Sequence, residues 1–219
     1  MVKDQSQHDR GKIAFVQTLI DAGLYEQYFQ FEEADCIVAE RVHLRILAER
    51  LAKCEIGDGN GYRDVVADVL VRSLDSIVDP EYVRLDPPCA NGEADIELPL
   101  ALERLGHNLL FQIWTNRYDL RSIVVEVKNQ QDPCPVGHVD QLFRYLDSND
   151  YGRFGLIVSR SRFTKNALRE LRDTAARGEK LMLPLGHQDL HDLISARAVS
   201  SSRVMQHLRR LETRLRQVT

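Results

Sequence analysis

The stretch Ser122-Ile123-Val124-Val125-Glu126-Val127-Lys128 decides the fold. β-Branched residues fill it, and Pro133 and Pro135 follow it closely, which predicts a buried strand. Residues two apart in a strand point to the same face, so Glu126 and Lys128 share one side, roughly 6.5–7 Å apart. Charges in a core strand cost free energy unless something pairs with them. A metal site at the edge of the sheet would account for both charges.

A second acidic stretch lies upstream, Glu93-Ala94-Asp95-Ile96-Glu97-Leu98, after a turn at Asn91-Gly92. If it pairs beside the first strand, Asp95 and Glu126 converge on one divalent cation, with Lys128 next to them. Hard oxygen ligands of this kind suit Mg²⁺, which binds through one or two carboxylates plus substrate phosphates. Such an arrangement is suited to activating water against a phosphodiester.

Asp95, then Glu126-Val127-Lys128, then a helix with Gln141 and Tyr145, resembles the PD-(D/E)xK nuclease superfamily, and within it the Mrr-like restriction endonucleases and RecB-like nucleases. The resemblance implies an α/β fold, a restriction-endonuclease-like core in which helices flank a central mixed sheet. It implies that Asp95, Glu126 and the Val127 carbonyl bind Mg²⁺, for which Mn²⁺ can substitute, and that Lys128 polarises the attacking water.

This sequence departs from the family pattern in two places. Alanine, not proline, precedes Asp95, and the long spacing from Asp95 to Glu126 must accommodate an extra element between Leu100 and Trp114. A different interpretation of the same residues stays open. Glu126 and Lys128 would then form an ion pair on an edge strand, with Asp95 as a turn residue.

The resemblance suggests three further site residues. Asp64 stands where many relatives carry a glutamate, although a carboxylate there also stabilises the first turn of a helix. Gln141 and Tyr145 are i and i+4 neighbours on one helical face. In relatives that face lies over the active site and contacts DNA; alternatively, Tyr145 packs with its hydroxyl at the surface.

Composition sets the broad class. The chain has 219 residues, 43% hydrophobic and 28% charged, which is ordinary for a soluble globular protein. We find no apolar run of membrane-spanning length, and the polar start does not resemble a signal peptide, so we expect a cytoplasmic protein without membrane contact. Four cysteines without C-x-x-C spacing make zinc and a disulfide framework unexpected.

The formal net charge of −4 does not by itself indicate a nucleic-acid-binding protein. The distribution of charge is more informative, because basic residues concentrate between Tyr151 and Lys180. We expect Arg160, Arg162 and Lys165 to bind nucleic acid, although a solvated helix face gives a similar pattern.

The chain divides into three parts at the Gly-rich loop 57–61 and after the last predicted strand. We expect a helical N-terminal extension (1–56), a nuclease-like domain (61–195) and a C-terminal helix (200–219). Within the domain, helices are predicted at 62–77, 139–146 and 165–177, and strands at 82–85, 94–98, 121–128, 153–159 and 180–185. Residues 109–114 fit a strand or a helical turn. His187 and His191 have the spacing of a helical metal pair, but Gly186 suggests a loop and no third ligand follows.

The C-terminal helix carries an apolar seam with heptad spacing, formed by Val204, Leu208, Leu211, Leu215 and Val218. A helix this short must bury its seam against something. One candidate is the chain's own N-terminal helix around Ile13, Val16 and Ile20, and the other is a second subunit. We expect a homodimer, or a complex with a partner protein, through some surface.

The function expected from the sequence is Mg²⁺-dependent cleavage of phosphodiester bonds. The substrate expected is DNA, with RNA not excluded, and the family resemblance implies defence against foreign DNA. Two alternatives remain: a silent nucleic-acid-binding module of the same fold, and an effector that a partner activates.

Overall fold

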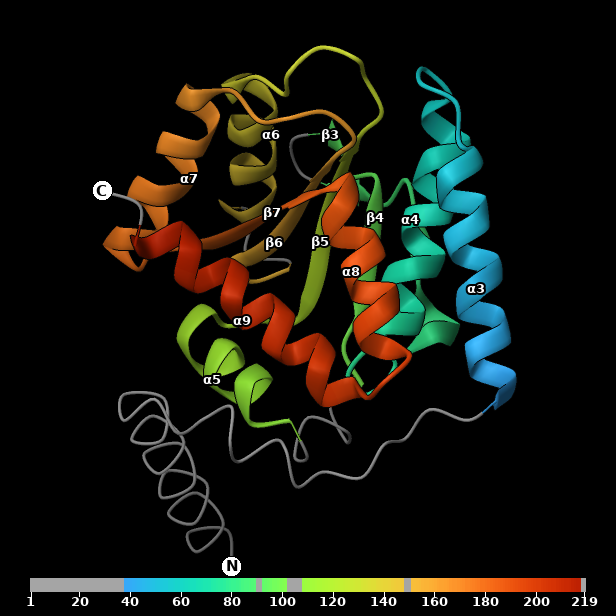
Figure 1. The fold of residues 1–219 in the computed structure, drawn as a ribbon. Coiled ribbons are helices and arrows are strands. Elements are labelled where there is room, and N and C mark those ends of the chain that lie inside the picture. Colours follow the sequence, from blue (N-terminus) through green and yellow to red (C-terminus); the bar gives the residue numbers. More distant parts are fainter. Residues whose placement is uncertain (1–37, 90–91, 102–107, 148–150, 218–219) are drawn as a thin grey trace, which may run out of the picture.

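The computed structural model describes residues 38–89, 92–101, 108–147 and 151–217 (Figure 1). The predicted helix around Ile13, Val16 and Ile20 lies outside these residues, and so does Val218 at the end of the seam. Of the predicted extension, Val38–Lys53 is described and forms helix α3. No helix in the described ranges is long and apolar enough to cross a membrane.

A five-stranded mixed sheet forms the centre, in the order β1-β4-β5-β6-β7. β4 runs antiparallel to β5, whereas β5, β6 and β7 are parallel to one another, so their C-terminal ends lie at one edge. Five strands build this sheet: β1 (Arg84–Leu85), β4 (Ile96–Pro99), β5 (Ser122–Lys128), β6 (Phe154–Ser159) and β7 (Leu181–Gly186). A separate two-stranded ladder joins β2 (Pro88–Cys89) to β3 (Gly92–Glu93).

Helices cover both faces of the sheet, as predicted. On one face α6 packs on β5 and β6, and α7 packs on β7; on the other lie α4 and α8, with α3 outside them (Figure 1). The last helix, α9, packs on α7, α8 and β7. The helices are α4 (Gly59–Ser73), α5 (Leu109–Tyr118), α6 (Val136–Asp147), α7 (Lys165–Arg177), α8 (His187–Arg197) and α9 (Ser201–Gln217), with a 3₁₀ turn at Pro80–Tyr82.

Local capping explains which predicted boundaries hold. The bounds predicted for α7 are confirmed: the Thr164 side chain accepts a hydrogen bond from the Ala167 amide, and Gly178 ends the helix at φ +74°. The loop expected at His187 is wrong, because α8 begins there. The Asp189 carboxylate accepts a hydrogen bond from the Gly186 amide at 2.7 Å and so stabilises the start of that helix.

Other elements also differ from expectation. The helix predicted at 62–77 is α4 at Gly59–Ser73, and the strand predicted at 82–85 is β1 at Arg84–Leu85. Residues 109–114 belong to a helix, α5, which answers the question left open by the sequence. The predicted strand 94–98 is shorter and later, so Asp95 lies just before β4. α5 fills the long connection between β4 and β5, which is how the unusual spacing from Asp95 to Glu126 is accommodated.

The apolar seam of α9 is part of the core of the chain. Val204, Leu208, Leu211 and Leu215 are all buried in the isolated chain. Among the described residues their neighbours are on α7, α8 and β7, and no second subunit is needed to cover them. The expected dimer therefore has to use another surface.

Candidate active site at the edge of the mixed sheet

β5 directs Glu126 and Lys128 toward α6. Val124 of β5 lies opposite Gly155 of β6, where an added Cβ would lie 3.5 Å from side-chain atoms of Leu142 and Leu146 on α6. Side chains two apart on a strand share a face, so Glu126 and Lys128 lie on this same side. The face that holds both charges is therefore the one that α6 covers.

Lys128 joins the two predicted acids. Its Nζ lies 2.5 Å from Oε1 of Glu126 and 3.8 Å from Oδ2 of Asp95. Asp95 Oδ2 also accepts a hydrogen bond from the Val127 amide at 2.6 Å. The structure therefore brings Asp95, Glu126 and Lys128 together. The ion pair of the alternative interpretation forms too, but on the central strand and not on an edge strand.

Glu126 is almost completely buried, at 1% exposure. Burial, together with the nearby charge of Asp95, raises its pKa to about 7, although Lys128 acts in the opposite direction. For Lys128, burial alone would lower the pKa, but the charges of Glu126 and Asp95 outweigh it and the net shift is upward. The lysine therefore keeps its proton at neutral pH.

One oxygen of Glu126 fits a metal ligand. Oε2 is buried and has no hydrogen-bond partner among the described residues, which is costly for a carboxylate. A hard cation bound by Glu126 and Asp95 would satisfy that oxygen, and an all-oxygen donor set is the kind Mg²⁺ prefers. The residues present therefore fit the ion that the fold family implies.

One family model matches part of the chain. Residues 103–188 match a family model described as restriction endonuclease, of the Mrr catalytic type. The match includes Glu126 and Lys128 on β5 and Gln141 and Tyr145 on α6, and Asp95 precedes it. This segment is similar to the catalytic domain of Mrr-type restriction endonucleases. The predicted resemblance to the PD-(D/E)xK superfamily is thereby confirmed for residues 103–188, whereas no curated protein and no solved structure matches the chain.

Tyr145 of the matched segment is buried and holds neighbouring chain in place. It is 1% exposed, and its hydroxyl donates to the Glu93 carbonyl at 2.7 Å and accepts from the Gln141 amide at 2.6 Å. The hydroxyl is therefore not at the surface, and an expected contact with DNA does not fit its burial. Its bond to Glu93 instead fixes the chain two residues before Asp95.

Asp64 lies on the exposed side of α4. Its carboxylate pairs with Arg63, which also bonds Asp86 at 2.6 Å. The Asp86 amide in turn donates to the Asp95 carbonyl at 3.1 Å. Asp64 is thus linked to the Asp95 segment through Arg63, and the described contacts do not include a direct one with Glu126 or Lys128.

The predicted nucleic-acid-binding residues lie where β6 leads into α7. The Arg160 amide donates to the Lys128 carbonyl at 2.9 Å, so this loop starts beside the end of β5. The Arg162 carbonyl accepts from the Cys134 amide at 2.8 Å, and Lys165 is exposed at the first position of α7. The three residues flank the candidate site along one edge of the sheet.

His138 is a neighbour of the site that sequence reasoning missed. It lies on α6, partly buried, and its pKa is lowered by burial and by the charge of Lys128. The predicted helix began at Val139, which left His138 outside it. Its spacing of three residues from Gln141 was the available signal, because residues i and i+3 share a helical face.

A second group of potential ligands lies elsewhere. Asp189 and Asp192 of α8 and His207 of α9 have ligand atoms within 4.8 Å of one another. His207 Nε2 is 3.6 Å from an oxygen of Asp189, whose other oxygen bonds the Gly186 amide. The contact between Asp189 and His207 therefore brings α8 and α9 together. His187, proposed as half of a metal pair, instead hydrogen-bonds the Tyr62 hydroxyl at 3.2 Å.

Proposed function

We propose that this chain is a Mg²⁺-dependent nuclease that hydrolyses phosphodiester bonds in DNA. The observation that supports it is the buried Glu126 carboxylate, which has one oxygen without a partner and lies beside Asp95 and Lys128. A buried carboxylate oxygen without a partner lowers the stability of the fold. Its presence near the C-terminal end of β5 is therefore best explained by a cation or substrate that binds it.

Each of the three side chains has a defined part in this proposal. Asp95, Glu126 and the Val127 carbonyl would hold Mg²⁺, or Mn²⁺ in its place, and the ion would supply positive charge at the scissile phosphate. Lys128 keeps its proton, since its pKa is raised, so it acts as a hydrogen-bond donor and not as a base. Its ammonium group orients the attacking water and stabilises charge that grows on the phosphate.

The first test is cleavage of plasmid DNA by single variants. Asp95→Asn, Glu126→Gln and Lys128→Ala should each lower the cleavage rate by about 100-fold or more, because each removes charge stabilisation at the reacting phosphate. The matched control is Asp140→Asn, an exposed acid on α6, which should cut at the wild-type rate. Cleavage that persists in EDTA, or in all three variants, would contradict the proposal. Parallel assays with RNA decide whether DNA is preferred.

The second test concerns the basic loop, which joins β6 to α7 (residues 160–164) and contains Arg160 and Arg162. Neutralising phosphates releases counterions, so the logarithm of DNA affinity should fall linearly with that of salt, by roughly 0.9 per contact. The triple variant Arg160→Gln, Arg162→Gln, Lys165→Gln should bind more weakly and show a flatter salt dependence. Arg45→Gln, which removes an exposed arginine of α3 paired with Glu49, is the control. An unchanged slope in the triple variant would place the DNA elsewhere.

Two extensions follow from the same proposal. The presence of Asp95, Glu126 and Lys128 together disfavours a silent binding module. We further propose that the enzyme acts in the cytoplasm, in defence against foreign DNA. Phage plating on cells that carry the wild type or Lys128→Ala tests that role. Cutting both strands calls for two centres, so we propose a homodimer, which sedimentation of the full chain would detect.

A further inference from the structure

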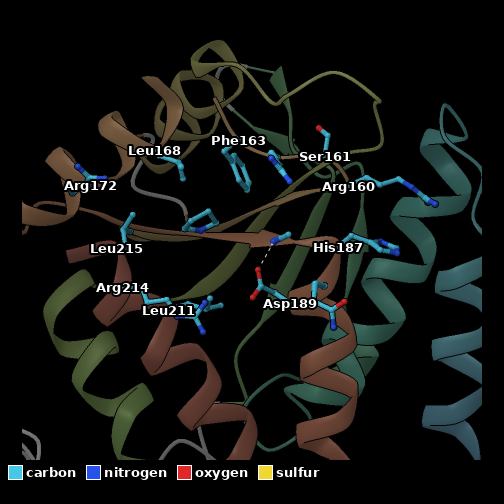
Figure 2. Close-up of a pocket in the computed structure, with 14 residues that line it drawn as sticks. Arg160, Ser161, Phe163, Leu168, Arg172, His187, Asp189, Leu211, Arg214 and Leu215 are labelled. Atoms are coloured by element: carbon cyan, nitrogen blue, oxygen red, sulfur yellow. Dashed lines mark hydrogen bonds between the residues drawn. The ribbon is translucent and has the colours of Figure 1, made fainter. Parts of the chain in front are cut away.

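A cavity of about 580 Å³ opens between the loop that follows β6 and the elements β7, α7, α8 and α9 (Figure 2). Apolar side chains form its walls. Phe163 and Leu168 come from the loop and α7, Leu211 and Leu215 come from α9, and Pro184 of β7 lies between them. This volume is in the range of sites for small organic ligands, roughly 300–1,000 Å³.

Four arginines surround these apolar walls: Arg160, Arg162, Arg172 and Arg214. Figure 2 shows Arg160 and Arg172 at opposite ends of the cavity and Arg214 beside Leu211 along one wall. Several other arginines pair with acids, as Arg197 does with Asp75 at 2.8 Å. None of the four makes such an ion pair with a carboxylate of the described residues.

Two of these arginines also have unsatisfied buried nitrogens. Nη1 of Arg160 and Nε of Arg172 have no hydrogen-bond partner in the described part of the chain, although both atoms are buried. The one acid that lines the cavity, Asp189, is already engaged by the Gly186 amide and by His207. The cavity therefore combines apolar walls with a surplus of positive charge.

The cavity lies close to the active site but is separate from it. Ile157 of β6 is the register partner of both Glu126 on β5 and Pro184 on β7. Glu126 and Pro184 therefore lie on the same face, two strands and roughly 10 Å apart. The loop that leads from β6 to α7 runs between them. It is fixed by backbone hydrogen bonds, since the Thr164 amide donates to the Cys134 carbonyl at 3.0 Å and the Cys134 amide donates to the Arg162 carbonyl.

We propose that this cavity binds a nucleotide, separately from the scissile phosphate. Guanidinium groups match the geometry of phosphate oxygens, so Arg172 and Arg214 would hold the phosphate. The flat aromatic faces of the base would pack against Phe163 and the leucines of α7 and α9. The nucleotide comes either from solution or from the DNA strand bound at the active site. The second source rests on the proposed nuclease function.

Calorimetry with the full chain and deoxyadenosine monophosphate, in EDTA, tests the proposal. The double variant Arg172→Gln, Arg214→Gln should weaken binding about tenfold or more, since it removes charge-assisted hydrogen bonds. The control Arg169→Gln, an exposed arginine of α7 outside the cavity, should change it less than about twofold. Leu168→Trp fills the cavity and should abolish binding, with thermal unfolding as the check that it folds.

Two outcomes would overturn the proposal: no binding at millimolar nucleotide, or binding that the double variant and Leu168→Trp leave unchanged. A competition experiment separates the sources. If the mononucleotide displaces a short single-stranded oligonucleotide, the cavity binds a nucleotide of the DNA strand. If both bind at the same time, the cavity binds a free nucleotide. Neither measurement needs cleavage, so a chain that binds nucleotide but never cuts DNA would refute the nuclease proposal alone.

Discussion

Burial makes ionisation of the Glu126 carboxyl unfavourable. The folded chain holds the proton on this carboxyl up to about pH 7, whereas the unfolded chain releases it near its ordinary pKa of 4.5. Between these values the native state binds more protons than the unfolded state, so stability falls as the pH rises. Above pH 7 both states are ionised and the dependence ends.

We therefore predict that the metal-free protein loses about 2–3 kcal/mol of unfolding free energy between pH 4.5 and 7 on account of Glu126, at 1.36 kcal/mol per pKa unit. Glu126→Gln removes the titration, so the wild type and the variant should differ in this window and run parallel above it. Urea unfolding in EDTA at several pH values measures the difference. Parallel curves throughout would mean that the carboxyl titrates normally.

For single residues, the sequence predicted which side chains form the site better than it predicted the contacts that those side chains make. The spacing of Glu126 and Lys128 places both on one face of any strand, which is why that part could be predicted. The bond from the Val127 amide to Asp95 joins residues 32 apart in the sequence, and only the folded sheet reveals it. His138 was missed because helix boundaries are the least certain part of such a prediction.

Among the elements, α6 is joined to β3, two residues before Asp95. Tyr145 is the contact that does this, through its hydrogen bonds with Glu93 and Gln141. The periodicity of α6 predicted that Gln141 and Tyr145 share a face. It did not show what that face meets, because a buried tyrosine and a DNA-contacting tyrosine have the same spacing.

Tyr145→Phe should lower the unfolding free energy by about 1–2 kcal/mol, since the Glu93 carbonyl loses its buried donor. It should also slow cleavage, because the chain just before Asp95 would be less firmly held. Tyr82→Phe is the control, as Tyr82 is 62% exposed and should change neither quantity. Denaturant unfolding together with plasmid cleavage measures both. A variant as stable as the wild type would show that the hydrogen bond contributes nothing.

In the molecule as a whole, α9 closes the core against α5 as well as α7 and α8. The buried Glu212 accepts a hydrogen bond from Trp114 Nε1 at 3.0 Å and pairs with Arg209 and Arg216. Arg216 also bonds the Tyr118 hydroxyl at 2.6 Å. The heptad spacing predicted a buried stripe on this helix. The polar network could not be predicted, because Trp114 and Glu212 are 98 residues apart.

Glu212→Gln keeps an acceptor for Trp114 but leaves Arg209 and Arg216 without their counter-charge. Breaking a buried ion pair costs about 3–5 kcal/mol, and Arg209 and Arg216 are partly exposed, so we expect about 2–3 kcal/mol here. Glu179→Gln, which removes an exposed acid paired with Arg177, should cost less than about 1 kcal/mol. Urea unfolding separates the two. Equal losses would show that the network does not hold α9 in place.

The pairing of the central strand has a kinetic consequence. Every ladder that β5 makes joins it to a strand about 30 residues away, β4 before it and β6 after it. Contacts of such high contact order form late, after the entropy of closing long loops has been overcome. A chain still emerging from the ribosome would hold Glu126 and Lys128 long before β6 exists to bury them. Lys128 can therefore pair with Asp95 and Glu126 only in the finished molecule. A partly synthesised or partly degraded chain would lack the site altogether.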